Sequence, residues 1–290
     1  MTTPSRCRVP ALVLLVSSLL GGCGGVASIG EDIGNAIGDG LICGLRNCTE
    51  SSQLNLDEIS PRFTATQAAG DNTVVISGSL GKSANLLTTV LMAPEESLQA
   101  SVDGRADVRM SNPDGKRWDY TARLATSSTQ PVVRVVFTRG GVRHVSEVTL
   151  PAAIAVLQPT GNPLLTRSGA ALSVRLNQST AATAFPTADG TCSRSDGSSF
   201  GLDGTSLVAQ AEGNVLGGYR LDPAAVDASL TERSRSLNNN DTRTPAVTRC
   251  DMVVTWTQEV LGTTPATMNR HGVMRGRRTA AHALTYDARL

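Results

Sequence analysis

The chain has 290 residues, of which 40% are hydrophobic and 18% are charged, and it contains 28 glycines and 13 prolines. This composition is typical of a globular, turn-rich protein and excludes a disordered one. The 26 basic residues nearly balance the 25 acidic ones, so a formal net charge of +1 gives no reason to expect nucleic acid as a partner.

The N-terminal residues have the layout of an export signal. Arg6 and Arg8 precede an apolar run from Val9 to Leu20, which the glycines of Gly21-Gly22-Cys23 follow. The run is about a dozen residues long, whereas a membrane-spanning helix needs about twenty. A basic start, a short apolar core and small residues before a cleavage site predict a signal peptide over residues 1–22. A soluble cleaved protein and an uncleaved anchor are the alternatives.

The segment Leu20-Gly21-Gly22-Cys23 resembles the lipobox of bacterial lipoproteins. The resemblance implies that Cys23 becomes the new N-terminus and carries several acyl chains, palmitate among them, which together anchor a protein stably to a membrane. Gly24 stands where enterobacterial lipoproteins of the inner membrane have an aspartate. The resemblance therefore implies the outer membrane, with the domains facing either the periplasm or the cell surface.

Export also fits the use of cysteine. Apart from Cys7 in the signal and Cys23, four cysteines remain: Cys43, Cys48, Cys192 and Cys250. Three pairings are possible, and distance along the chain favours one disulfide between the first two and another between the last two. The sequence has no Cys-x2-Cys pair and only three histidines, so we expect no metal and no cofactor.

Residues 23–52 are rich in glycine and predict a lipidated tether rather than a stable helix. From residue 53 to residue 158 apolar and polar residues alternate in short runs, which is typical of β-strands. Apolar and polar residues alternate strictly in two runs, Arg105–Met110 and Arg117–Leu124. The turn sequence Asn112-Pro113-Asp114-Gly115 lies between them, so this segment predicts a β-hairpin. Further short strands predict an antiparallel immunoglobulin-like β-sandwich.

The stretch Pro151–Pro163 reads as the link to a second domain over residues 159–290. There, Asp222-Pro223 predicts the start of one short helix, with the aspartate as its N-terminal cap. In the strand Val247–Glu259, Cys250 and Trp256 share a face, which predicts an inward-pointing cysteine. The fold class we expect is all-β, with two tandem antiparallel immunoglobulin-like sandwiches after a tether. In layout the chain resembles uncharacterised two-domain bacterial lipoproteins of this kind.

One motif suggests catalysis. Gly197-Ser198-Ser199-Phe200-Gly201 matches the G-x-S-x-G pattern of serine hydrolases, with His271 and His282 later in the chain. The motif lacks a preceding apolar strand and a following helix, so a polar loop explains Ser199 better than a nucleophile does.

Two further patterns suggest ligands. Asp189-Gly190, Asp196-Gly197 and Asp203-Gly204 recur every seven residues, where successive turns compete with a calcium loop as the explanation. Near the C-terminus an arginine cluster predicts either a binding patch for an anionic polymer or a solvated edge strand whose arginines prevent pairing with other chains. Its members are Arg270, Arg275, Arg277 and Arg278.

Taken together, these features predict a non-catalytic lipoprotein of the cell envelope with a binding or scaffold role. Its expected partners are the membrane, through the lipid anchor, and an envelope or surface protein or an anionic polymer. The alternatives are an extracytoplasmic serine hydrolase that uses Ser199 with His271 or His282, and a structural spacer.

Overall fold

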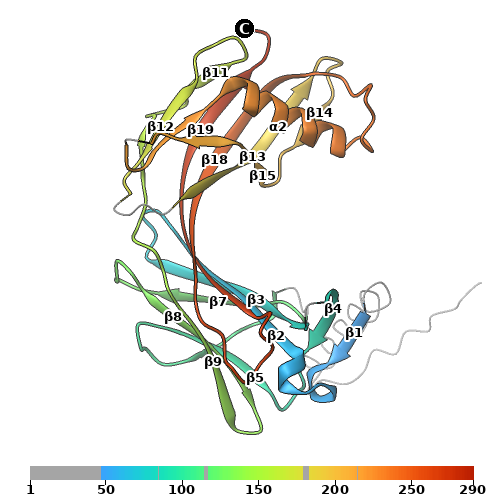
Figure 1. Ribbon diagram of the computed structural model, residues 1–290, viewed down its shortest axis with the longest axis vertical. Coiled ribbons are helices and arrows are strands. Elements are labelled where there is room, and N and C mark those ends of the chain that lie inside the picture. The colour runs from blue at the N-terminus through green and yellow to red at the C-terminus, as the bar shows by residue number, and fades with distance from the viewer. Residues whose placement is uncertain (1–46, 84, 114–116, 179–182, 214) are drawn as a thin grey trace, which may run out of the picture.

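The computed structural model describes residues 47–290 except for 84, 114–116, 179–182 and 214. The expected signal peptide, the lipidation site Cys23 and most of the predicted tether, with Cys43, lie outside the described residues. The described chain folds into two lobes, each with its own hydrophobic core (Figure 1).

The first lobe contains the elements up to β9. They are β1 (Asn47–Glu50), the 3-10 helices η1 (Ser51–Gln53) and η2 (Leu56–Glu58), β2 (Ile59–Ala68), β3 (Thr73–Lys82), β4 (Asn85–Leu91), β5 (Ser97–Val102), β6 (Val108–Arg109), β7 (Tyr120–Ala125), β8 (Val132–Arg139) and β9 (Val142–Thr149).

The second lobe is built from the elements that follow. They are β10 (Val156–Gln158), β11 (Leu164–Thr166), β12 (Leu172–Leu176), β13 (Ala184–Arg194), β14 (Ser199–Gly201), β15 (Thr205–Ser206), β16 (Ala209–Ala211), β17 (Gly218–Leu221), α2 (Pro223–Ser236), β18 (Val247–Leu261) and β19 (Val273–Asp287).

The largest sheet runs through both lobes. Its strand order is β1-β4-β3-β2-β19-β18-β13-β14, and β7, β11 and β15 add to β3, β19 and β13. In the first lobe the sheet β6-β5-β8-β9 covers it, and the core lies between the two sheets. In the second lobe the sheet β10-β12-β17-β16 and helix α2 cover it. The chain is thus all-β, with two β-sandwiches, as the sequence predicts. The pairings are not all antiparallel as expected, because β1 pairs in parallel with β4, and β11 and β2 pair in parallel with β19.

The hairpin of β18 and β19 joins the two lobes (Figure 1). Each strand has 15 residues, a length of about 50 Å, which exceeds what one sandwich needs. In the second lobe β18 pairs with β13, while in the first lobe β19 pairs in parallel with β2 from Val273 to Thr279. Met268 and Met274 belong to the first core. The chain therefore leaves the first lobe between β9 and β10, and the tip of the hairpin returns to it.

Helix α2 begins as the sequence predicts. The Asp222 carboxylate accepts hydrogen bonds from the backbone N–H groups of Ala224 and Ala225, and Pro223 occupies the first helical position. Val226 and Leu230, one turn apart, are buried in the second core.

The predicted hairpin over residues 105–124 is wrong. Strand β6 pairs with β5, whereas β7 pairs with β3 in the large sheet, and among the described residues a single isolated bridge, between Ser111 and Thr121, pairs the backbones of the two runs. The alternation of polar and apolar residues indicates that each run is a strand with one solvent-exposed face, but it does not indicate which strand each one pairs with.

Candidate functional site

The junction of the two lobes is held by a buried arginine. Arg278 of β19 is 4% exposed. Its guanidinium donates hydrogen bonds to the carbonyl oxygens of Pro151 at 3.0 Å and Thr129 at 2.6 Å, and to the side-chain oxygen of Gln67. Burial lowers the pKa of Arg278. This side chain ties β19 to β2, to the loop before β8 and to the interlobe link.

The four arginines expected to form an anion patch do not form one surface. Arg275 and Arg277 point to the opposite face from Arg278 because successive side chains alternate along a strand, and both form ion pairs with Glu259 of β18. Arg270 lies apart, exposed in the loop before β19. Nor is β19 an edge strand, because β2 and β18 flank it in the first lobe. Both expectations for this cluster are corrected.

Glu259 is the centre of the ion pairs on the outer face. Burial alone would raise the pKa of its carboxyl group, but hydrogen bonds from Arg277 and Arg275 outweigh this, and the pKa is lowered. The Glu259 carboxylate therefore neutralises charge of two arginines that the sequence pattern had assigned to an anion-binding patch.

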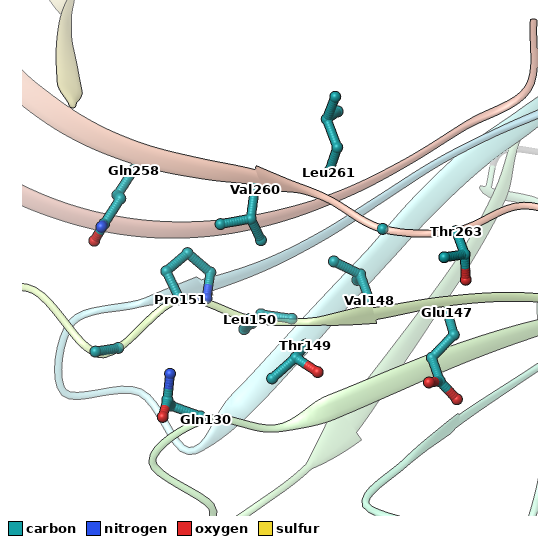
Figure 2. Close-up of a pocket in the computed structure, with 12 residues that line it drawn as sticks. Gln130, Glu147, Val148, Thr149, Leu150, Pro151, Gln258, Val260, Leu261 and Thr263 are labelled. Atoms are coloured by element: carbon teal, nitrogen blue, oxygen red, sulfur yellow. The ribbon is translucent and has the colours of Figure 1, made fainter. Parts of the chain in front are cut away.

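A pocket of about 490 Å³ opens beside this junction (Figure 2). One wall is the end of β9 and the start of the link, residues 147–152, and the other is the end of β18 and the residues after it, 258–263. Val260 projects between the two walls, toward Leu150 and Pro151 (Figure 2). The lining is mixed: aliphatic side chains alternate with the polar side chains of Gln130, Glu147, Thr149, Gln258 and Thr263.

Two glycines shape this pocket. A side chain at Gly262 would meet the Glu147 carbonyl oxygen at 2.1 Å, and one at Gly276 would meet Val148 at 2.9 Å. The close approach at Gly262 allows Glu147 and Thr263 to exchange two backbone hydrogen bonds, of 3.0 and 2.8 Å. β9 is thus fastened to the end of β18 at one point, and the two segments separate beyond it to leave the pocket.

The structure does not bring Ser199 close to either histidine. Ser199 is exposed in β14, opposite Ser193 of β13. His282 lies opposite Val254, at the level of Ala188, so the strands separate the two by about 17 Å lengthwise and about 14 Å sideways. His271 lies beyond the far end of the same hairpin. The geometry needed for proton transfer from a serine to a histidine is not present.

The two buried histidines, His282 and His144, have the surroundings of structural residues. His282 is 8% exposed, and neither ring nitrogen has a hydrogen-bond partner. His144 of β9 contacts the Thr267 hydroxyl through Nδ1 at 2.8 Å. Burial lowers the pKa of each imidazole, and Arg139 lowers that of His144 further.

The three Asp-Gly carboxylates have different contacts, and Asp189-Gly190 lies within strand β13 rather than in a turn. Asp189 accepts a hydrogen bond from the Gly204 N–H at 2.7 Å, Asp196 accepts two from Ser198, and Asp203 pairs with Arg233 at 3.0 Å. Within the described residues, no cluster of three or more histidine, cysteine or acidic side chains is suited to a metal. The turn interpretation fits Asp196-Gly197 and Asp203-Gly204, whereas Asp189 accepts its hydrogen bond from within a strand.

The Cys192–Cys250 disulfide is confirmed. The two cysteines are direct cross-strand neighbours on β13 and β18, with Cα atoms 4.0 Å apart, and both are fully buried. Trp256, on the same face of β18, is also buried and lies 4.8 Å from the Tyr219 ring. Cys48 is disulfide-bonded too, and its expected partner Cys43 lies outside the described residues.

Sequence reasoning missed a buried polar cluster at the start of the first lobe. The Glu96 carboxylate is buried and binds Arg139, the Ser51 hydroxyl and the Ala93 N–H. Arg139 also donates to the carbonyl oxygens of Ser51 at 2.6 Å and Leu54 at 2.9 Å. The end of the predicted tether is therefore part of the fold, with β1 paired in parallel to β4. The role of these residues is visible only in their tertiary contacts.

No helix of the described segments is long and apolar enough to cross a membrane. Comparison with known proteins identifies no relative by sequence: neither a family model nor a curated protein matches. Among solved structures, a chimeric titin Z1Z2-Z1Z2 tandem with a fibronectin peptide matches 76% of this chain and 97% of its own, at 13% identity and a TM-score of 0.21. A chimeric titin Z1Z2 with a decorin peptide covers 81% and 99%, at 13% identity and a TM-score of 0.22. At these TM-scores the likeness supports no functional argument.

Proposed function

We propose that this chain is a membrane-anchored lipoprotein of the cell envelope, whose two lobes form a non-catalytic binding or scaffold body. Cys23 is the lipidated residue in this proposal, and the outer membrane is the site of anchoring. The partner is another protein of the envelope or cell surface.

The buried Cys192–Cys250 disulfide supports export. Disulfides persist in oxidising compartments and are rare in the reducing cytosol, and this one lies in the second core, where both sulfurs are shielded from solvent. Together with the lipobox-like segment ending at Cys23, it favours a location outside the cytoplasm.

The observation that carries the binding role is the junction between the lobes. The β18–β19 hairpin and Arg278 couple the lobes into one body, and the pocket beside Val260 opens on the side of that junction. Pockets at interfaces between structural units are common binding sites.

Metabolic labelling with an alkyne analogue of palmitate, followed by separation of inner and outer membranes, tests the anchoring. We expect the wild-type chain to be labelled and recovered with the outer membrane, and the Cys23→Ala variant to be unlabelled. Equal labelling of both chains would contradict lipidation at Cys23. Protease treatment of intact cells then shows whether the lobes face the surface, where they are digested, or the periplasm, where they are protected.

A further inference from the structure

Arg278 is a buried cation without a counter-ion. It is almost fully buried, and it forms no ion pair with an acidic side chain in the described part of the chain. Burial alone lowers its pKa, because no neighbouring carboxylate stabilises the charged form in return. Arginine is almost never fully buried unless it is paired, since the cost of removing its charge from water needs an opposite charge to offset it. This position therefore favours the binding of an anion.

The guanidinium also has donors that are not in use. An arginine side chain has five N–H donors, and three bonds are formed here. Nε donates to Pro151, Nη1 to Gln67 and Nη2 to Thr129. One N–H on each Nη atom is therefore left without an acceptor among the residues that the structure describes.

A cavity of about 220 Å³ lies beside this guanidinium. It is lined by the end of β2 and the turn after it, residues 67–72, by residues 126–129 before β8, by the start of the link at residues 153 and 154, and by Arg278. Gln67 and Thr129, which bind the two Nη atoms, both line the cavity, whereas Pro151, which binds Nε, does not. The Nη end of the guanidinium therefore faces the cavity.

We infer that this cavity binds a small carboxylate monoanion against the Nη atoms of Arg278. The planar guanidinium matches the planar carboxylate in shape and in charge. Ser127 and Ser128 also line the cavity, and neither hydroxyl forms a hydrogen bond within the described structure. Both hydroxyls can therefore donate to the oxygens of the anion.

The size and charge of the cavity restrict the ligand. Pockets for drug-sized molecules have volumes of about 300–1,000 Å³, so this smaller cavity takes a small molecule or the end of a chain. Asp71 also lines it, but its carboxylate accepts the Thr73 N–H at 2.8 Å and does not pair with Arg278. One cation beside one acidic residue favours a monoanion over a phosphate ester, whose charge is about −1.5 to −2.

This site differs from the surface patch that the sequence predicts, because it contains one buried arginine rather than four exposed ones. It goes beyond the proposed function and does not depend on the protein partner named there.

Titration of the full chain with N-acetylalanine, followed by amide NMR shifts, tests the site. We expect saturable shifts of the Ser128 and Ala153 amides, and none with N-acetylalanine amide, which has a similar shape but no charge. Acetate separates the two sources of a carboxylate. Equal or tighter binding of acetate would indicate a free small anion, whereas tighter binding of N-acetylalanine would indicate the end of a chain.

Two variants place the ligand beside Arg278. Ser128→Asp adds a fixed carboxylate to the cavity and should weaken binding by roughly tenfold or more. Ser195→Asp, the same change in an exposed turn of the second lobe, should leave the affinity unchanged. The Ser128 side chain is half-buried and forms no hydrogen bond in the described structure, so the variant should keep the fold, which its urea midpoint checks. Arg278→Lys keeps the charge but loses the planar fork, and should also weaken binding.

Four results would overturn the inference: no saturable shift at the highest soluble concentration, equal affinity for the amide, competition by chloride with equal affinity, or full affinity in a folded Ser128→Asp variant.

Discussion

Replacing Arg278 should destabilise the molecule, because this one side chain fastens β19 to β2, to the loop before β8 and to the start of the link between the lobes. Its guanidinium donates to acceptors on Pro151, Thr129 and Gln67, all at the junction. In an Arg278→Met variant, these acceptors lose a cationic donor, and solvent has little access to replace it. The shorter apolar side chain also leaves the link without its attachment to β19.

The magnitude follows from these contacts. Each hydrogen bond from a charged group contributes about 1.5–3 kcal/mol, but the substitution also removes the desolvation cost of a buried cation. We therefore expect a net loss of about 3 kcal/mol in the free energy of unfolding. For a domain of this size, that lowers the melting temperature by about 6–12 °C.

Thermal and urea unfolding of the two variants Arg278→Met and Arg275→Met provide the assay and its control. Arg275 is three residues away on the same strand, but it lies on the outer face and pairs only with Glu259, so we expect its loss to cost about 1 kcal/mol or less. Equal shifts for the two variants, or a shift below about 1 °C for Arg278→Met, would refute the assignment of Arg278 as the side chain that fastens β19 to β2 and to the link.

Three other substitutions test separate parts of the fold. The paired change Cys192→Ser and Cys250→Ser, which opens a loop with a sequence separation of 58 residues, should cost about 4 kcal/mol, seen as a lower urea midpoint; an unchanged midpoint would contradict this. Glu96→Gln leaves the Arg139 cation without its carboxylate, and should cost about 3 kcal/mol and expose the segment before β2 to limited proteolysis; unchanged cleavage would contradict its anchoring role. Burial holds the pKa of His282 below 6.5, so the unfolded state binds more protons and stability falls as pH drops below about 6.5. The variant His282→Phe should show a smaller loss between pH 8 and pH 5, by up to about 1.4 kcal/mol per pH unit in the affected range, and an identical pH profile would contradict this.

Several local features could be predicted because their signals are short in range. The cap of α2 depends on Asp222 and Pro223, which are adjacent in sequence, and the inward direction of Cys250 follows from strand periodicity alone. Strand β2 was not predicted, because Ser60 and Pro61 break its pattern and its inner face includes Gln67. That glutamine is buried with both polar atoms of its side chain bound, the oxygen to Arg278 from the other end of the chain and the nitrogen to the Asp71 carbonyl.

The candidate site was not predictable in the same way. The pocket depends on two glycines, Gly262 and Gly276, whose closeness to β9 and the link is a property of the assembled lobes. The arginine cluster was predicted as one patch because its members are close in sequence. Side chains alternate along β19, however, so Arg278 points inward and Arg277 points outward, where it pairs with Glu259.

The sequence by itself determined the all-β class, the start of the helix, the pairing of Cys192 with Cys250 and the expectation of an anchor at Cys23, because composition, periodicity and motif are local properties. The tertiary structure alone decided that the lobes share the β18–β19 hairpin, that Arg278 is buried where the chain leaves the first lobe, and that a pocket opens between the ends of β9 and β18. These features depend on which strands pair across more than a hundred residues of chain, and strand pairing is selected by the packing of the whole core rather than by any one segment.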